Sequence, residues 1–279
     1  MKPALTICLL AACGGGGSDS DSRPTTFGGD RPVDIKLPPG FDGSHDYPLI
    51  IGLHGYGSSG FVHVAYFGLA KLVSEDKALL LAPDGTIDNG GSPFWNADPA
   101  CCDFNNKMPD DVGYIGKIID DVIAAYPIDK SRVFVIGHSN GGYMAYRMAC
   151  ERPDVITAIA GLAGAASSVP ASCTPSRDIN VLHIHGTADE TVPYAAGVGA
   201  EGSVQQWAGH DGCGATLTPG ATYDLDTSLA GQETQALTAG CPSGVAVELW
   251  KVEGGSHIPN WGPTFTPTLW QWLDEHPRK

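Results

Sequence analysis

Short apolar runs alternate along the chain with longer stretches in which apolar residues recur every three or four positions. The apolar runs predict strands at 48–53, 78–81, 131–136, 155–160, 180–185 and 245–252. The periodic stretches predict helices at 61–76, 110–126, 142–149 and 267–273. Runs that are apolar throughout are typical of strands buried on both faces. The alternation therefore favours a single-domain α/β fold, with a doubly wound, mostly parallel sheet and helices on both faces.

The sequence Gly-His-Ser-Asn-Gly at 137–141 stands between a predicted strand and a predicted helix. It matches the G-x-S-x-G pattern of a nucleophile elbow, in which a sharp turn exposes a serine at the carboxyl end of a sheet. The flanking glycines let the strand and helix backbones pass closely. Ser139 is therefore the candidate nucleophile.

A serine hydroxyl needs a histidine base, and the histidine needs a carboxylate that fixes its tautomer. Asp189 follows the predicted strand at 180–185, and His257 follows the one at 245–252. Both residues lie in loops after strands, in the chain order serine, acid, histidine that this kind of elbow favours. Glu190 is the competing acid, and we prefer Asp189 because it lies nearer the strand end.

The loop after the strand at 48–53 begins with His-Gly-Tyr-Gly. A serine hydrolase built on such a sheet stabilises its oxyanion with two backbone N–H groups, one from the residue after the nucleophile and one from this loop. These criteria indicate Asn140 and Tyr56 as the oxyanion hole. The Tyr56 phenol is expected either in the acyl pocket or facing solvent.

These segments resemble the secreted polyhydroxybutyrate depolymerase and feruloyl esterase group of α/β-hydrolases, which also includes acetylxylan esterases. The resemblance runs from about residue 33 to the C-terminus, through Leu-His-Gly at 53–55, Phe-Trp-Asn at 94–96, His-Gly-Thr-Ala-Asp at 185–189 and Gly-Gly-Ser-His at 254–257. It implies an α/β-hydrolase fold and the triad Ser139, Asp189 and His257. It also implies an extracytoplasmic serine carboxylesterase that works through an acyl-enzyme.

The substrate is less well defined by the sequence than the reaction is. Many members of the group follow the catalytic histidine with Thr-Trp-Pro-Gly, whereas this chain has Ile-Pro-Asn-Trp-Gly at 258–262, which displaces Trp261. We expect a polyhydroxyalkanoate depolymerase first, a feruloyl or acetylxylan esterase on plant polysaccharide second, and a non-catalytic surface binding module as the alternative of another class. Trp95 and Trp261 are the candidate substrate-binding residues, with Trp207 as a further possibility. The turn-rich segment 83–109 is the expected wall of the cleft.

The N-terminus has the pattern of a targeting segment. A basic start and a short apolar stretch end in Leu-Ala-Ala-Cys at 10–13, which resembles a bacterial lipoprotein cleavage box. We expect a signal peptide at 1–12, a lipidated Cys13, a Gly/Ser/Asp-rich flexible linker at 13–30 and the catalytic domain at 31–279. A cleaved secretory signal is the alternative. Either places the protein outside the cytoplasm, and lipidation would make a membrane surface its partner.

Of the eight cysteines, six remain after Cys8 in the signal and Cys13 are set aside. An even number in an exported protein indicates disulfides. The preferred pair is Cys213 with Cys241, and Cys150 with Cys173 is a weaker prediction that leaves Cys101 with Cys102 as a vicinal bridge.

The formal net charge of −15 disfavours nucleic acid and anionic polymers as partners and suits a neutral polymer or an uncharged ester. His183 and His185 share one face of a strand, but the chain has no C-x-x-C or H-E-x-x-H pattern, so core histidines are favoured over a metal site. We expect no metal or other cofactor, and the sequence implies no protein partner.

Overall fold

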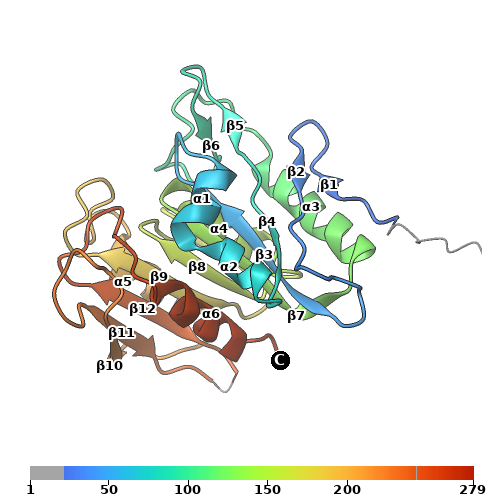
Figure 1. Cartoon of the computed structure of the whole chain (residues 1–279). Helices are drawn as coiled ribbons and strands as arrows, with labels where there is room; N and C mark the ends of the chain where they lie inside the picture. The colour runs from blue at the N-terminus through green and yellow to red at the C-terminus, as the bar shows by residue number, and fades with distance from the viewer. Residues whose placement is uncertain (1–21, 243) are drawn as a thin grey trace, which may run out of the picture.

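The computed structural model describes residues 22–279 except residue 243, and an eight-stranded sheet forms its centre (Figure 1). The strand order is β10-β11-β12-β9-β8-β7-β3-β4, with parallel pairing from β12 to β4 and antiparallel pairing of β10, β11 and β12. In chain order the strands of this sheet are β3 (Tyr47–Leu53), β4 (Leu79–Leu81), β7 (Ile128–His138), β8 (Ala158–Leu162), β9 (Asn180–Gly186), β10 (Leu217–Tyr223), β11 (Thr234–Ala239) and β12 (Val247–Val252). Two small sheets pair β1 (Thr26–Phe27) with β2 (Val33–Asp34) and β5 (Thr86–Ile87) with β6 (Pro93–Phe94).

Six α-helices and a short 3-10 helix complete the described chain. They are α1 (Gly60–Phe67), α2 (Leu69–Ser74), α3 (Asp111–Ala125), α4 (Asn140–Glu151), α5 (Gly199–His210), α6 (Phe265–Glu275) and the 3-10 turn at Pro170–Ser172. None of the helices in the described part of the chain is both long enough and apolar enough to cross a bilayer.

The sheet has helices on both faces, and its central strands contribute to two separate cores. Leu49 and Ile51 of β3 belong to the cluster that contains the apolar side chains of α3, α4 and α5. Ile50 belongs to the opposite cluster, with side chains of α1, α2 and α6. Successive side chains thus alternate between the two cores, and neither face of the strand is exposed. This explains the uninterrupted apolar runs in the sequence. The predicted α/β-hydrolase fold is confirmed.

Two predicted features need correction. The helix predicted at 61–76 is broken at Gly68, whose φ of +67° ends α1 and is a conformation that glycine adopts readily. The catalytic domain was predicted to start at residue 31, yet Phe27 is buried in the core and β1 pairs with β2, so the packed structure includes part of the range 13–30. The predicted signal peptide and Cys13 lie outside the described residues.

The segment between β9 and β12 carries α5 and the hairpin β10–β11, which extends the sheet beyond β12. Cys213 at the start of this hairpin is bonded to Cys241 at its end. Cys150 of α4 is bonded to Cys173, and Cys101 to Cys102. These are the three pairings that the sequence analysis considered.

Candidate active site

Ser139 occupies the turn between β7 and α4 with φ 54° and ψ −120°, a strained backbone conformation for a residue that is not glycine. Its amide donates to the Leu162 carbonyl of β8 at 2.8 Å, which fixes the turn to the neighbouring strand. A Cβ at Gly141 would overlap the Leu53 carbonyl oxygen, and one at Gly137 would overlap the carbonyl oxygen of Gly141. The two glycines are therefore required by the crossing of α4 over the ends of β3 and β7.

Asp189 and His257 meet in the loops after β9 and β12, which are adjacent parallel strands. His257 Nδ1 lies 2.7 Å from Asp189 Oδ2. Because an ionised carboxylate only accepts, Nδ1 carries the proton and Nε2 is left as the basic nitrogen. Glu190, the competing acid, is exposed.

Asp189 is buried, and four donors surround its carboxylate. Oδ1 accepts from the backbone amides of Thr191 and Val192, each at 2.8 Å. Oδ2 accepts from His257, and His185 Nε2 lies 3.2 Å from the same oxygen. Burial alone raises the pKa of Asp189, but the bonds from His185, His257 and Val192 outweigh it and hold the pKa well below its ordinary value.

His138, the residue before Ser139, connects the turn at Ser139 to His257. Its Nε2 donates to the backbone carbonyl of His257 at 3.0 Å, and the two rings lie 5.0 Å apart. Burial lowers the pKa of His138 to about 4, so this ring stays neutral and adds no charge beside the base at neutral pH. His257 is thereby held next to the turn that carries Ser139.

His54 and Gly85 shape the loop predicted to supply the second oxyanion donor. The Gly85 amide donates to His54 Nε2 at 2.9 Å, so Nδ1 carries the proton and donates to the Gly55 carbonyl at 2.7 Å. A Cβ at Gly55 would come within 3.3 Å of the Ser139 Cβ, which shows how closely this loop approaches the nucleophile. Tyr56 is the next residue in the chain. Its side chain is exposed, and its hydroxyl donates a hydrogen bond to Asp88.

Asn140 is the first residue of α4, where a backbone N–H has no acceptor within the helix and the dipole favours negative charge. Its side chain has a second role that the sequence analysis missed. Oδ1 accepts from the Trp95 amide at 2.7 Å and Nδ2 donates to the Trp95 carbonyl at 2.9 Å. This pair of bonds fastens the segment after β6 to the start of α4.

Two of the three tryptophans considered for substrate binding are core residues. Trp95 is fully buried, and its indole N–H donates to the His54 carbonyl at 3.0 Å, so it supports the loop after β3 from the core side. The prediction that Trp95 contacts substrate is wrong because the Phe-Trp-Asn segment turns the indole inward. Trp207 is likewise buried in the core. Trp261 is partly exposed and stacks on Phe265 with ring centroids 3.9 Å apart.

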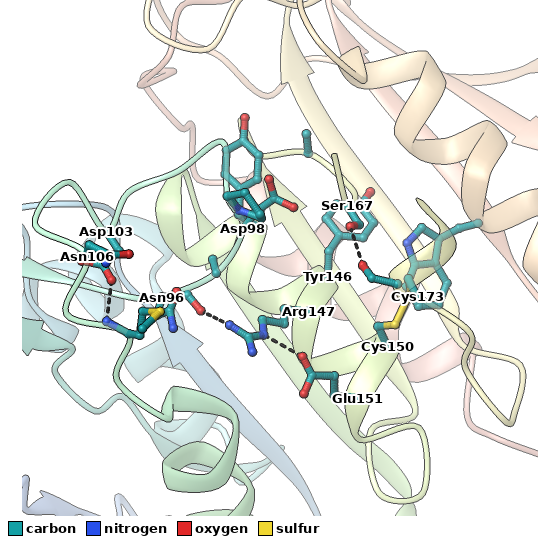
Figure 2. A pocket seen from close by; sticks show the side chains of 17 residues that line it. Asn96, Asp98, Asp103, Asn106, Tyr146, Arg147, Cys150, Glu151, Ser167 and Cys173 are labelled. Carbon is teal, nitrogen blue, oxygen red and sulfur yellow. Dashed lines mark hydrogen bonds and ion pairs between the residues drawn. A yellow bond between two sulfur atoms is a disulfide. The ribbon is translucent and has the colours of Figure 1, made fainter. Parts of the chain in front are cut away.

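A pocket of about 530 Å³ lies along α4, one turn beyond Ser139 (Figure 2). Its floor is the α4 face that carries Tyr143, Tyr146 and Arg147, and its walls are parts of the segments 96–108 and 165–173. Arg147 is held within the pocket by the Asn96 carbonyl oxygen and by Glu151 Oε1, the latter at 2.7 Å. The segment 83–109, predicted as a cleft wall, thus contributes one side of this pocket.

His183 and His185 are fully buried, as the core interpretation requires, and no group of three or more His, Cys, Asp or Glu side chains in the described part of the chain is arranged to hold a metal ion. Their rings nevertheless lie between α4 and Asp189. In the sequence, the only sign of this arrangement is that His183 and His185 lie two positions apart on the strand that leads to Asp189.

A parallel sheet with a serine at a strained strand-to-helix turn, followed by an acid and a histidine after later strands, defines the serine-hydrolase class of α/β-hydrolases. The chain matches the phospholipase/carboxylesterase family over residues 42–216 and belongs to it. The matched segment contains Ser139 and Asp189, whereas His257 lies beyond it.

The relatives are esterases. Feruloyl esterase B of Piromyces equi is 28% identical over 242 residues, which are 81% of this chain and 42% of that protein, so the chain spans less than half of its length. Feruloyl esterase D of Neurospora crassa is 27% identical, with 92% of this chain and 86% of that protein covered. Among solved structures, an acetyl xylan esterase from Aspergillus awamori superposes with a TM-score of 0.66 at 16% identity, covering 87% of this chain and 93% of that one. The resemblance to the feruloyl esterase group is confirmed.

Replacing Asn140 with alanine should destabilise the protein without removing the backbone N–H of residue 140. The Asn140→Ala change leaves two buried backbone groups of Trp95 without partners, at a cost of about 2–4 kcal/mol in the free energy of unfolding. Urea denaturation measures this loss. Asn105→Ala is the matched control, because Asn105 also accepts from a backbone amide, but on the exposed surface. An equal shift in both variants would contradict the role of the Asn140 side chain.

Proposed function

We propose that the protein is a serine carboxylesterase in which Ser139, His257 and Asp189 form the catalytic triad. The observation that carries the proposal is the 2.7 Å hydrogen bond from the partly exposed His257 to the buried Asp189, held beside the strained turn of Ser139. His257 Nε2 takes the proton from Ser139, whose oxygen attacks the ester carbonyl. The same histidine then protonates the leaving alkoxide, and water repeats the sequence to release the acid.

The oxyanion hole in this proposal consists of the backbone N–H groups of Tyr56 and Asn140. Asn140 contributes from the N-terminus of α4, where the dipole stabilises developing negative charge. The His54–Gly55 contact and the Trp95 indole hold the Tyr56 loop against Ser139. Each donor of this kind typically contributes about 3–4 kcal/mol to transition-state stabilisation.

We propose feruloyl or acetyl esters of plant polysaccharide as the first substrate class. The relatives named above as feruloyl and acetyl xylan esterases support it. The pocket along α4 adds support, since it offers space one turn from the nucleophile for the part of the substrate beyond the ester. Its lining combines polar and apolar side chains, and its one arginine is already paired with Glu151, which suits a neutral group with both apolar and hydroxylated parts.

A polyhydroxyalkanoate is the second candidate, and a different observation favours it. The large apolar side chains that are exposed in the described part of the chain all lie in segments that follow the carboxyl ends of β3, β4, β8 and β12, which is the sheet edge that carries the triad. We call them the apolar rim: Tyr56, Phe61, Val62, Ile87, Phe104, Met108, Val169 and Ile258. An apolar rim around a hydrolytic site suits the surface of a water-insoluble polyester.

We propose an extracytoplasmic location. Three disulfides persist best in an oxidising compartment. The Leu-Ala-Ala-Cys sequence at 10–13 supports lipidation of Cys13, with a membrane surface as the resulting partner.

Ser139→Ala should abolish ester hydrolysis and leave the fold intact, because the hydroxyl is the nucleophile and its loss creates no clash. The measurement compares wild type with this variant on methyl ferulate, acetylated xylan, polyhydroxybutyrate and its soluble oligomers. Ser139-dependent preference for ferulate or acetyl groups supports the first candidate, and preference for hydroxybutyrate supports the second. A binding module without catalysis replaces both if Ser139→Ala matches wild type on every substrate.

Phe61→Ser and Val169→Ser should lower the rate on a polyhydroxybutyrate film several-fold more than the rate on a soluble ester, because each removes exposed apolar contact area. Lys117→Ser on α3 is the control, since its side chain is 73% exposed and lies away from the rim. Equal effects on film and soluble ester would remove the argument for the polyester.

Cys13→Ala should release the protein from the membrane fraction of a bacterial host, because the lipid is attached to that thiol. Labelling with a radioactive fatty acid measures the modification directly. Absence of label in the wild type would replace the lipoprotein proposal with a cleaved secretory signal.

A further inference from the structure

A chain of buried side chains leads from α4 to the carboxylate of Asp189. Tyr146 Oη lies 2.8 Å from His183 Nδ1, and His183 Nε2 lies 3.0 Å from His185 Nδ1. His185 Nε2 lies 2.8 Å from the Val192 carbonyl oxygen and 3.2 Å from Asp189 Oδ2. Tyr146, His183 and His185 are buried and contact one another in this order.

The direction of every hydrogen bond in this chain follows from its two ends. A carbonyl oxygen only accepts, so His185 Nε2 carries a proton and points it between Val192 and Asp189. At the other end, the buried Tyr146 hydroxyl donates to His183 Nδ1. His183 is neutral, so its Nε2 carries the proton and donates to His185 Nδ1. All the donors point toward Asp189.

Tyr146 and His183, the two members of the chain farther from Asp189, carry no charge. Burial, and after it the neighbouring His185, lowers the pKa of His183 far below its ordinary value. Burial raises the pKa of the Tyr146 hydroxyl, which therefore remains a donor. Aligned neutral donors that end on a buried carboxylate strengthen one another and favour its ionised form.

We propose that His185 is a positioning residue of the triad: its Nε2–H, oriented through His183 by Tyr146, holds the Asp189 carboxylate ionised and directed at His257. The proposal rests on the proposed esterase function and deepens it. Tyr146 also lines the pocket along α4 (Figure 2). The three side chains, which we call the relay, therefore connect the pocket floor with the carboxylate oxygen of Asp189 that also accepts from His257.

Three titratable side chains near Asp189 and His185 keep one charge state near neutral pH. Burial raises the pKa of the neighbouring tyrosines and lowers that of the neighbouring histidine; these groups are Tyr143, Tyr194 and His138. Lys251 and Glu253, which form an ion pair at 3.1 Å, lie near Tyr194, on its side of the site. A shift in the pH profile of a relay variant therefore reports on the Asp189–His257 pair.

The test measures kcat and KM for p-nitrophenyl acetate between pH 4 and 9 in the full chain. His185→Phe keeps a ring and removes both nitrogens. Without its donor, Asp189 stabilises protonated His257 more strongly, so the acid limb of kcat/KM should move up by about half a pH unit. We expect kcat to fall about 10-fold with little change in KM, a smaller loss than that of the general base itself.

His185→Gln places an amide N–H where Nε2–H was and should return the acid limb toward its wild-type position. Tyr146→Phe removes a single oxygen and should move the limb in the same direction by a smaller amount, with kcat about 2-fold lower. It also keeps the proposal testable if His185→Phe does not fold. Tyr47→Phe is the matched control, because it removes a buried tyrosine hydroxyl bonded to Asp76 at the opposite edge of the sheet.

The proposal is overturned if the acid limb stays at its wild-type pH in Tyr146→Phe and His185→Phe, whatever their stability, or if His185→Gln behaves like His185→Phe. Absence of Ser139-dependent turnover in the wild type would instead reject the esterase function, so the two failures are distinguishable.

Discussion

The close crossing of α4 over the ends of β3 and β7 is the constraint on which the site depends. Gly141 passes directly beneath the Leu53 carbonyl, and Gly137 beneath that of Gly141 itself. This approach brings the loop after β3 into contact with Ser139 at the N-terminus of α4. Any side chain larger than hydrogen at either glycine would force α4 away from these strand ends and disturb the turn that carries Ser139.

Around that crossing, α4 contributes to the elbow, to the segment after β6 and to the pocket. Its first residue, Asn140, carries the backbone N–H that we propose for the oxyanion hole, and its side chain fastens the Trp95 segment. Its following turns carry Tyr143 and Arg147 along the pocket floor. The disulfide from Cys150 then ties the end of the helix to the opposite wall.

The sequence predicted those parts of the fold and site that depend on local pattern. The strand at β7, the elbow after it and the loops that carry Asp189 and His257 follow from apolar runs and glycine positions, because both are needed wherever buried strands end in tight turns. Side-chain contacts between residues far apart in the sequence could not be predicted. Trp95 stands in a turn-rich segment that gives no sign of which way the indole points, and His183 and His185 show only a strand spacing until Asp189 and α4 are placed around them. The break at Gly68 was missed because one glycine within a helical pattern is compatible with both outcomes.

The hairpin β10–β11 has a consequence for the strand that delivers His257. Without the hairpin, β12 would be the outermost strand, with a free row of backbone donors and acceptors open to pairing with other chains. With it, β12 is hydrogen-bonded on both sides, and the exposed edge passes to β10. There Pro219 lacks an amide hydrogen and the register shifts before Thr222, so the new edge is a poor template for another strand. The hairpin thus protects β12 from pairing with other chains, which would disturb the loop that holds His257 against Asp189.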